Sequence, residues 1–255
     1  MVYVAFLVFT FFILVLAFYQ WQFLSVFYPK YYREDILDDN FEMLSILTTD
    51  GIELEGVIYK PKGYHSVMLF YAGRGNDAVA MIKRLSLLYP DIAIITFNYR
   101  SYGKSGGVVN EKNIFEDGLY IAEMVKKHYG EFYILGFSLG ASVASFVASK
   151  TDTKSLFLVG AFKSIISLAK QKYRFIPSML IRYRFESDKF LQHTQTDVYL
   201  FLSKDDEIVD VQNSRGLKGC INNLKYYCEL DNVMHKELLW HEAVVQKIKG
   251  VIEQG

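Results

Sequence analysis

Charged side chains are absent from the first 29 residues of this 255-residue sequence, and the whole sequence has no excess of either charge. All 28 basic and all 28 acidic side chains lie at or after Lys30, so the formal net charge is zero. A nucleic-acid-binding surface needs clustered Lys and Arg, and this balance gives no support for one. The sequence therefore divides into an uncharged leader and an ordinary charged remainder.

Cysteine is also scarce. The two cysteines, Cys220 and Cys228, are too few for a disulfide framework, and with five histidines they do not show the spacing of a zinc site. Apolar residues make up 51% of the chain and charged residues 22%, which excludes a disordered protein. We therefore expect a folded domain with neither a disulfide scaffold nor a structural metal.

The leader has the length and composition of a membrane-spanning helix. Residues 2–19 carry a single polar side chain, and about 20 apolar residues suffice to span the hydrocarbon core. Trp21 and Tyr28 suit the membrane interface. A signal peptide would have a basic start and a shorter apolar run, and a core helix would have a polar face. We expect a retained anchor over 1–28 and a charged, polar tether over 29–40.

The charged residues next to the leader bear on which side of the membrane the domain lies, but they are few. Lys30 and Arg33 follow the leader and no basic residue precedes it, which favours the cytoplasm for the domain that follows. The acidic Glu34 and Asp35 lie beside them, so this charge signal is small. Two cysteines without an evident pairing agree with a reducing compartment. We expect a single-pass membrane protein whose main domain is cytoplasmic.

From Phe41 onward, strand-like and helix-like segments alternate. The expected strands cover 41–48, 52–59, 67–71, 92–99, 132–135, 155–159, 198–202 and 225–230. The expected helices cover 78–88, 114–128, 139–149 and 237–252. The first two strands flank a Thr-Asp-Gly turn and form an antiparallel hairpin. This alternation predicts an α/β fold with a mostly parallel sheet, helices on both faces, and ligands at the carboxyl ends of the strands.

A candidate nucleophile lies directly after an expected strand. Residues 136–140 read Gly-Phe-Ser-Leu-Gly and lead into a helix rich in small residues. The small residues leave room for a sharp strand-to-helix turn that exposes the Ser138 hydroxyl at a helix N-terminus. A Gly-x-Ser-x-Gly pattern also occurs by chance in glycine-lined connections, but the strand and helix around it favour a nucleophile.

A serine hydroxyl needs a neighbouring base and an acid that orients the base. His235 lies between the last expected strand and the last helix, where this architecture places the base. His241 is expected inside the closing helix, and His65, His128 and His193 lie elsewhere. The acid belongs in the loop after residues 198–202, where spacing alone leaves four candidates open: Asp205, Asp206, Glu207 and Asp210.

Four stretches together resemble the α/β-hydrolase superfamily, with a particular likeness to membrane-anchored bacterial relatives of the Bem46-like and ABHD13-like hydrolases. They are Thr49–Gly56, Tyr71–Asn76, Asn98–Gly106 and Gly136–Gly140. The third is similar to an Asp-Tyr-Arg-Gly-Tyr-Gly-Lys-Ser run of the relatives, and the likeness covers the chain from Phe41. Three positions depart from the relatives: Ala72 replaces a histidine, Asn98 an aspartate and Ser101 a glycine.

The resemblance implies specific roles. An Asp-x-x-Val pattern in the relatives maps onto Asp206, with Asp205 as the second choice, and the residues after His235 match a helix start of the relatives. In this fold, two backbone N–H groups stabilise an oxyanion. One belongs to Leu139, and the other maps onto Arg74, with Gly73 and Gly75 as alternatives. These roles describe a serine hydrolase that cleaves esters or thioesters through an acyl-enzyme and needs no metal or cofactor.

A cap is expected at about 161–195, between two strands. It interleaves large apolar residues with six basic ones and has no acid before Glu186; the basic residues are Lys163, Lys170, Lys172, Arg174, Arg182 and Arg184. Such a segment suits a lid that lies on an anionic membrane and admits acyl chains, or two ordinary covering helices with a solvated basic face.

If the cap is a lid, lipid esters, acylated proteins or thioesters near the bilayer become the expected substrates. One alternative function is a peptidase of the prolyl-oligopeptidase type, which shares the triad; such peptidases usually add a large gating domain, for which 255 residues leave no room. Another is a membrane-bound interaction protein without catalysis, which the complete set of triad candidates disfavours.

Overall fold

The computed structural model describes residues 2–31 and 39–255. It contains one eight-stranded sheet with the order β1-β2-β4-β3-β5-β6-β7-β8. The strands are β1 (Phe41–Leu47), β2 (Glu53–Tyr59), β3 (Val67–Tyr71), β4 (Ala93–Phe97), β5 (Tyr133–Phe137), β6 (Ser155–Val159), β7 (Asp197–Ser203) and β8 (Leu224–Leu230). The β1–β2 hairpin is antiparallel and joins β4 in antiparallel register, whereas β3 to β8 pair in parallel. The sheet is therefore mostly parallel, as predicted.

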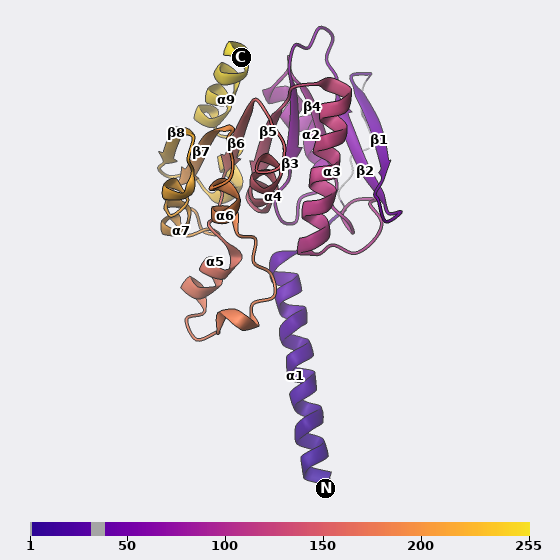
Figure 1. The fold of residues 1–255 in the computed structure, drawn as a ribbon, viewed down its shortest axis with the longest axis vertical. Coiled ribbons are helices and arrows are strands. Elements are labelled where there is room, and N and C mark those ends of the chain that lie inside the picture. Colours follow the sequence, from indigo (N-terminus) through magenta and orange to yellow (C-terminus); the bar gives the residue numbers. More distant parts are fainter. Residues whose placement is uncertain (1, 32–38) are drawn as a thin grey trace.

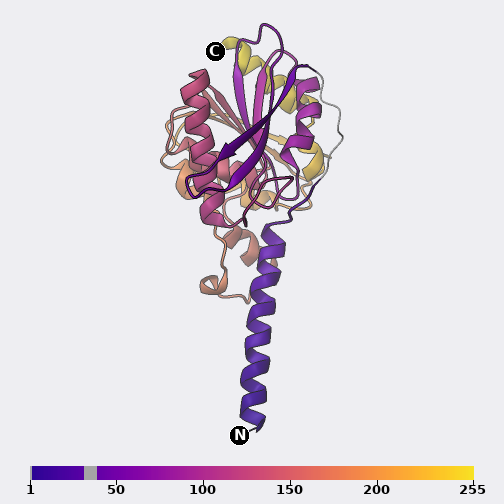
Figure 2. The ribbon, with the colours of Figure 1, turned by 90° about the vertical axis from the view of Figure 1, so that its right-hand side faces the viewer.

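Helices cover both faces of this sheet (Figures 1 and 2). One core contains the apolar sides of α3 (Glu111–Tyr129) and α4 (Leu139–Ala148). The other contains those of α2 (Ala78–Leu88) and α9 (Glu242–Gln254). The central strands are buried along their whole length, because the side chains of each strand alternate between the two cores.

The segment between β6 and β7 corresponds to the expected cap and is called the cap below. It contains α5 (Ile165–Lys172), the short 3₁₀ helix η1 (Ser178–Leu180) and α6 (Ser187–Leu191). The connection between β7 and β8 carries α7 (Val211–Arg215) and the 3₁₀ helix η2 (Lys218–Cys220), and α8 (His235–Leu238) follows β8. Both cysteines are free thiols.

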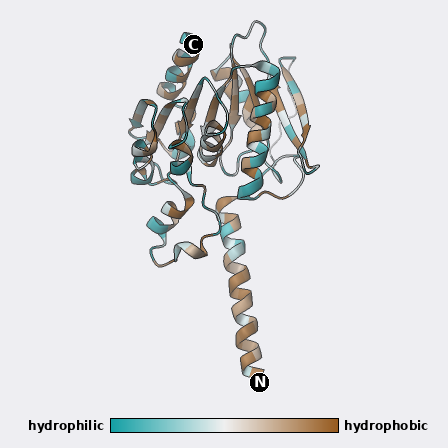
Figure 3. Cartoon of the chain, in the orientation of Figure 1, coloured by the Kyte–Doolittle hydropathy of each residue, from teal (hydrophilic) through white to brown (hydrophobic). Residues whose placement is uncertain are grey.

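The leader forms one long helix, α1 (Val2–Val26), which extends away from the sheet (Figure 1). Its most apolar stretch of 18 residues has a mean hydropathy of 2.6, and its 25 residues are long enough to cross a membrane. Figure 3 shows that α1 is hydrophobic over most of its length and becomes more polar toward the domain. Residues 32–38 of the expected tether, which include Arg33, Glu34 and Asp35, lie outside the described residues.

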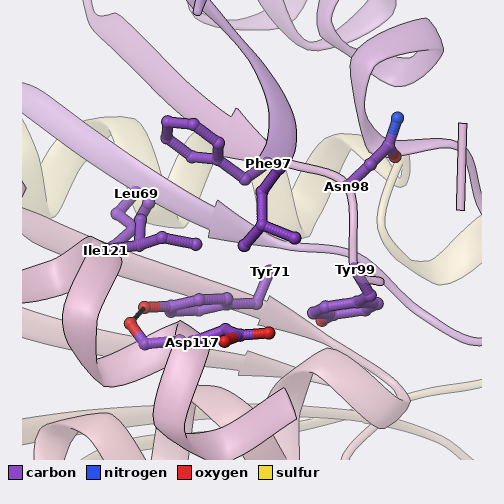
Figure 4. A pocket seen from close by; sticks show the side chains of 9 residues that line it. Leu69, Tyr71, Phe97, Asn98, Tyr99, Asp117 and Ile121 are labelled. Carbon is purple, nitrogen blue, oxygen red and sulfur yellow. Dashed lines mark hydrogen bonds between the residues drawn. The ribbon is translucent and has the colours of Figure 1, made fainter. Parts of the chain in front are cut away.

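A buried arginine secures the hairpin turn to the rest of the domain. Arg100, in the loop after β4, binds Asp50 of the hairpin turn at 2.6 Å and Asp117 of α3 at 2.7 Å. The Arg100 guanidinium holds the pKa of Asp50 well below its ordinary value, chiefly through their hydrogen bonds. A cavity of about 10 Å³ lies nearby, bordered by Tyr71, Tyr99 and Asp117 (Figure 4). It is at the lower limit for a single water molecule and too small for a substrate.

Candidate active site

Ser138 lies in a strained turn between β5 and α4. Its φ of 54° falls in the left-handed region, which non-glycine residues seldom adopt. The glycines on either side make the turn possible. A Cβ on Gly140 would lie 2.1 Å from the Tyr71 carbonyl oxygen, and one on Gly136 would lie 2.6 Å from the Ala144 Cβ. The Gly-x-Ser-x-Gly pattern is therefore required by close backbone packing at both glycines.

His235 reaches the serine from the other end of the chain. It is the first residue of α8, its side chain is 5% exposed, and its ring packs on Phe137 with the centroids 5.2 Å apart. Its Nε2 lies 2.9 Å from Ser138 Oγ, and its Nδ1 lies 2.6 Å from Asp206 Oδ2. With the proton on Nδ1, this nitrogen donates to the carboxylate and Nε2 accepts from the hydroxyl. The structure thus brings the three predicted residues together in one hydrogen-bonded chain.

Asp206 is held by the loop that follows β7. Its side chain is 3% exposed, and its second oxygen accepts the backbone N–H groups of Ile208 at 2.9 Å and Val209 at 2.7 Å. These two bonds fix the carboxylate so that the oxygen facing His235 has one orientation. In the Asp-x-x-Val pattern, the valine lies three residues after the aspartate. The N–H of Val209 therefore reaches back to orient the Asp206 carboxylate.

The other three acids of this loop have different partners. Asp205 accepts the backbone N–H of Asn232 at 2.6 Å, and Asp210 caps α7. Glu207 accepts the backbone N–H of His235 at 2.8 Å. Glu207 therefore helps to position the His235 backbone. The sequence alone gave no reason to expect this contact.

One expectation about the remaining histidines was wrong. The closing helix predicted over 237–252 is two helices, α8 and α9, separated at Leu239–His241. His241 is not inside a helix: it is the N-cap of α9, where its Nδ1 accepts the Ala243 N–H at 3.3 Å. His128 bonds the Met124 carbonyl oxygen in α3 at 2.8 Å.

The candidate oxyanion donors flank the serine. Leu139 is the first residue of α4, so its N–H is free of the helical hydrogen-bond ladder. Gly73, in the loop after β3, is so near that a Cβ on it would lie 3.2 Å from the Ser138 Cβ. The guanidinium of the adjacent Arg74 donates to the Leu24 carbonyl oxygen of α1 at 2.6 Å. The Arg74 side chain therefore connects the loop after β3, which holds the candidate second oxyanion donor, to the leader helix.

The structure shows the local surroundings of the three positions at which the sequence departs from the relatives. Asn98 donates to Asp77 at 2.8 Å within a buried polar cluster, and its other amide atom accepts the first N–H of α2. Ser101 has a φ of 67°, a conformation that explains why the relatives carry glycine there. Ala72 is buried, and its carbonyl oxygen accepts the Tyr99 hydroxyl at 2.8 Å.

A pocket of about 720 Å³ opens above Ser138. One wall consists of cap residues from Phe162 to Tyr183, and another of residues 206–210 around the acid. A third wall comes from α1, from residues Phe18, Trp21, Gln22, Ser25 and Val26. The volume is in the range of small-molecule and lipid sites. The participation of α1 was missed at the sequence level, where the leader was expected to serve only as an anchor.

Comparisons with known proteins find relatives by sequence and by fold. Lysophosphatidylserine lipase ABHD12 of Danio rerio is 30% identical over 179 residues, which cover 60% of this chain and 46% of that protein. The chain thus spans about half the length of the curated relatives it matches. No protein-family model matches the sequence.

Solved structures share the architecture more completely. The Pyrococcus furiosus esterase Pf2001 has a TM-score of 0.69 at 15% identity, with 89% of this chain and 96% of that chain covered. An esterase from Exiguobacterium antarcticum has a TM-score of 0.64 at 13% identity, with 83% of this chain and 100% of that chain covered. The chain therefore has the α/β-hydrolase fold, and its sequence is similar to that of these lipases.

Proposed function

We propose that this protein is a membrane-anchored serine hydrolase that cleaves carboxylic ester or thioester bonds through an acyl-enzyme on Ser138. The main support is the hydrogen-bonded chain from Ser138 through His235 to Asp206 beneath a pocket of about 720 Å³. Such a chain supplies the base and the orienting acid that a serine hydroxyl needs.

The proposed reaction has two half-reactions. Ser138 Oγ attacks the acyl carbonyl while His235 Nε2 accepts its proton, and that proton then passes to the departing alcohol or thiol. A water molecule next gives its proton to His235 and attacks the acyl-serine, which releases the carboxylic acid and restores Ser138. Asp206 keeps the imidazole in the required tautomer throughout.

Two backbone N–H groups stabilise the tetrahedral oxyanion in this proposal. Leu139 supplies the first and Arg74 the second, with Gly73 and Gly75 as the alternatives within the same loop. One such donor stabilises the transition state by about 3 kcal/mol. The contact between the Arg74 side chain and α1 would hold this loop against the serine.

The proposed substrate is a lipid-like ester. The relative's name describes a lipase that acts on lysophosphatidylserine, and the pocket has α1 as one of its walls. The cap adds a second feature that suits a membrane: Phe175 is 98% exposed and Met179 is 87% exposed, among basic side chains. These observations favour the lid interpretation of the cap over two ordinary covering helices.

We also propose the domain division given by the sequence. Residues 1–28 anchor the chain, 29–40 form the tether, and 41–255 form the hydrolase domain with a cap at about 161–195. The catalytic domain faces the cytoplasm in this proposal, since Lys30 and Arg33 follow the anchor.

The test uses the full chain in detergent or vesicles, with p-nitrophenyl esters and peptide amides as substrates. We expect ester hydrolysis, and we expect Ser138→Ala to lower it to background. Ser142→Ala is the matched control, because Ser142 is a buried serine one turn further along α4 whose hydroxyl has no hydrogen-bond partner among residues 2–31 and 39–255. Ester hydrolysis that survives in Ser138→Ala, or cleavage of amides alone, would reject the proposal.

A further inference from the structure

One face of the last turns of α1 forms part of the pocket described above. The five lining residues follow the spacing i, i+3, i+4, i+7 and i+8, which places them on one side of a helix: Phe18, Trp21, Gln22, Ser25 and Val26. Cap residues such as Ile165 and Leu168 of α5 line the same pocket, and so does Ser138. The pocket therefore continues from the serine into the space between α1 and the cap.

Buried contacts fix this part of α1 to the cap. Gln22 is 7% exposed, its amide donates to the Leu180 carbonyl oxygen at 3.1 Å, and it accepts the Arg182 N–H at 2.8 Å. Phe27, just past the helix end, is fully buried against Tyr183, with ring centroids 4.9 Å apart. An anchor that only tethered the domain would need none of these contacts, so the end of α1 is a structural part of the domain.

The position of α1 indicates where the pocket lies relative to the membrane. Residues 2–20 extend about 28 Å at 1.5 Å per residue, close to the thickness of the hydrocarbon core. This places Trp21 at the interface on the domain side, where its ring meets Tyr173 of the cap at 5.3 Å. Figures 1 and 2 both show the cap beside these last turns of α1. The outer part of the pocket therefore lies at the level of the membrane interface.

We propose that the last turns of α1 and the cap helix α5 together form the acyl-chain subsite of the enzyme. A membrane amphiphile with one acyl chain enters it from the leaflet, its chain lies between α1 and α5, and its ester carbonyl reaches Ser138. The side chains of α1 then set the length of acyl chain that the enzyme accepts. This inference rests on the proposed ester hydrolysis at Ser138 and adds the position of the substrate chain.

The test places a bulky side chain on the lining face of α1. In the full chain, Ser25→Trp fills part of the subsite, and the probes are p-nitrophenyl esters of four and twelve carbons in detergent. Each methylene buried by a site strengthens binding about fourfold, so exclusion of a few methylenes should lower kcat/KM for the twelve-carbon ester by at least about tenfold. The four-carbon ester should change by less than about twofold, because a short chain does not reach α1.

Leu16→Trp is the matched control, since Leu16 lies on the opposite side of α1 from Ser25, is 68% exposed and is not part of the pocket lining. It should leave both esters unchanged. A graded series, Ser25→Val, Ser25→Leu and Ser25→Trp, should shift the preferred chain length downward step by step. The hydrolysis of the four-carbon ester reports that each variant is folded.

The outcomes separate the two proposals. An unchanged chain-length profile across the Ser25 series, or an equal loss of both esters in every member, would overturn the acyl-chain subsite while leaving the hydrolase assignment intact. A wild-type chain that hydrolyses neither ester would instead overturn the proposed function on which the subsite rests.

Discussion

Asp205 and Asp206 are neighbours in the chain, but their carboxylates have different partners. The Asp206 carboxylate faces the ring of His235, whereas that of Asp205 accepts the backbone N–H of Asn232. We expect Asp206→Asn to lower kcat by about 10³- to 10⁴-fold, because an amide does not hold the imidazole in the productive tautomer. The measurement is steady-state ester hydrolysis by the full chain.

Asp205→Asn serves as the control for this prediction. Its side chain remains able to accept the Asn232 N–H, so kcat should stay within a few-fold of wild type. If Asp205→Asn were the variant with the large loss, the acid would be assigned to the wrong residue.

An ion pair away from the active site gives the domain a predictable response to acid. The Arg215 guanidinium donates to Glu229 of β8 and lowers the pKa of this carboxyl to about 2 from an ordinary 4.5. The contribution of Glu229 to stability is therefore fully present above pH 4.5 and is lost as the pH falls toward 2. The free energy of unfolding should fall more steeply over this range in wild type than in Glu229→Gln, as measured by urea titration at several pH values. Parallel pH profiles for the two proteins would contradict this account.

The sequence allowed some of these residues to be assigned and not others, for physical reasons. Ser138 could be found because the turn around it needs small residues at fixed spacing, which is a local requirement. The acid could not be chosen by spacing, since four carboxylates lie within six residues and each can reach a nearby N–H. Only the resemblance selected Asp206, and the contact of Glu207 with the His235 backbone depends on how two distant loops meet.

At the scale of single elements, the turn between β5 and α4 requires glycine at position 140 because the backbone is packed closely there. A Cβ on Gly140 would meet the Tyr71 carbonyl oxygen at 2.1 Å, and a backbone atom of a central strand cannot move aside easily. We expect Gly140→Ala to destabilise the domain by about 1–3 kcal/mol and to displace Ser138. Thermal unfolding in detergent and ester hydrolysis together measure these effects.

Gly250→Ala provides the opposite case. Gly250 lies within α9, and a Cβ there has open space around it. This substitution should raise stability by about 0.5–1 kcal/mol, since alanine favours a helix over glycine. A stabilising effect of Gly140→Ala would show that the turn is not constrained as described.

The boundaries of several elements were predictable from the sequence. The expected strands 67–71 and 155–159 agree with β3 and β6, because buried apolar runs identify them. The expected helix 78–88 agrees with α2, because its buried residues recur at helical spacing. The division of the closing helix into α8 and α9 was not predictable. Its apolar residues continue at helical spacing across the break, although His241 has an extended backbone there. The cap helices were not delimited, since basic and apolar residues alternate there without a clear period.

At the scale of the whole molecule, the leader and the domain form one unit. The sequence indicated an anchor and a tether as separate parts, because a run of apolar residues carries no information about what it packs against. Gln22 was the available signal: a polar residue within an apolar helix, with its amide bonded to the cap over a separation of 158 residues.

The side of the membrane on which the domain lies can be tested directly. With Cys220 and Cys228 replaced by serine, a single cysteine at the exposed position Glu253 of α9 should resist a membrane-impermeant maleimide in intact cells and react after permeabilisation. A single cysteine at Val2, at the other end of α1, should react in intact cells. This pattern follows from the basic residues after the anchor, and the reverse pattern would place the domain on the other side.

The central claim is that Ser138, His235 and Asp206 act together as one acyl-transfer centre, and mass spectrometry of the protein after treatment with a fluorophosphonate tests it most directly. We expect one adduct per chain, carried by the peptide that contains Ser138, with ester hydrolysis lost in proportion to labelling and with labelling abolished in His235→Ala. An adduct on another residue, or an inert Ser138 in a folded chain that still hydrolyses esters, would contradict the account.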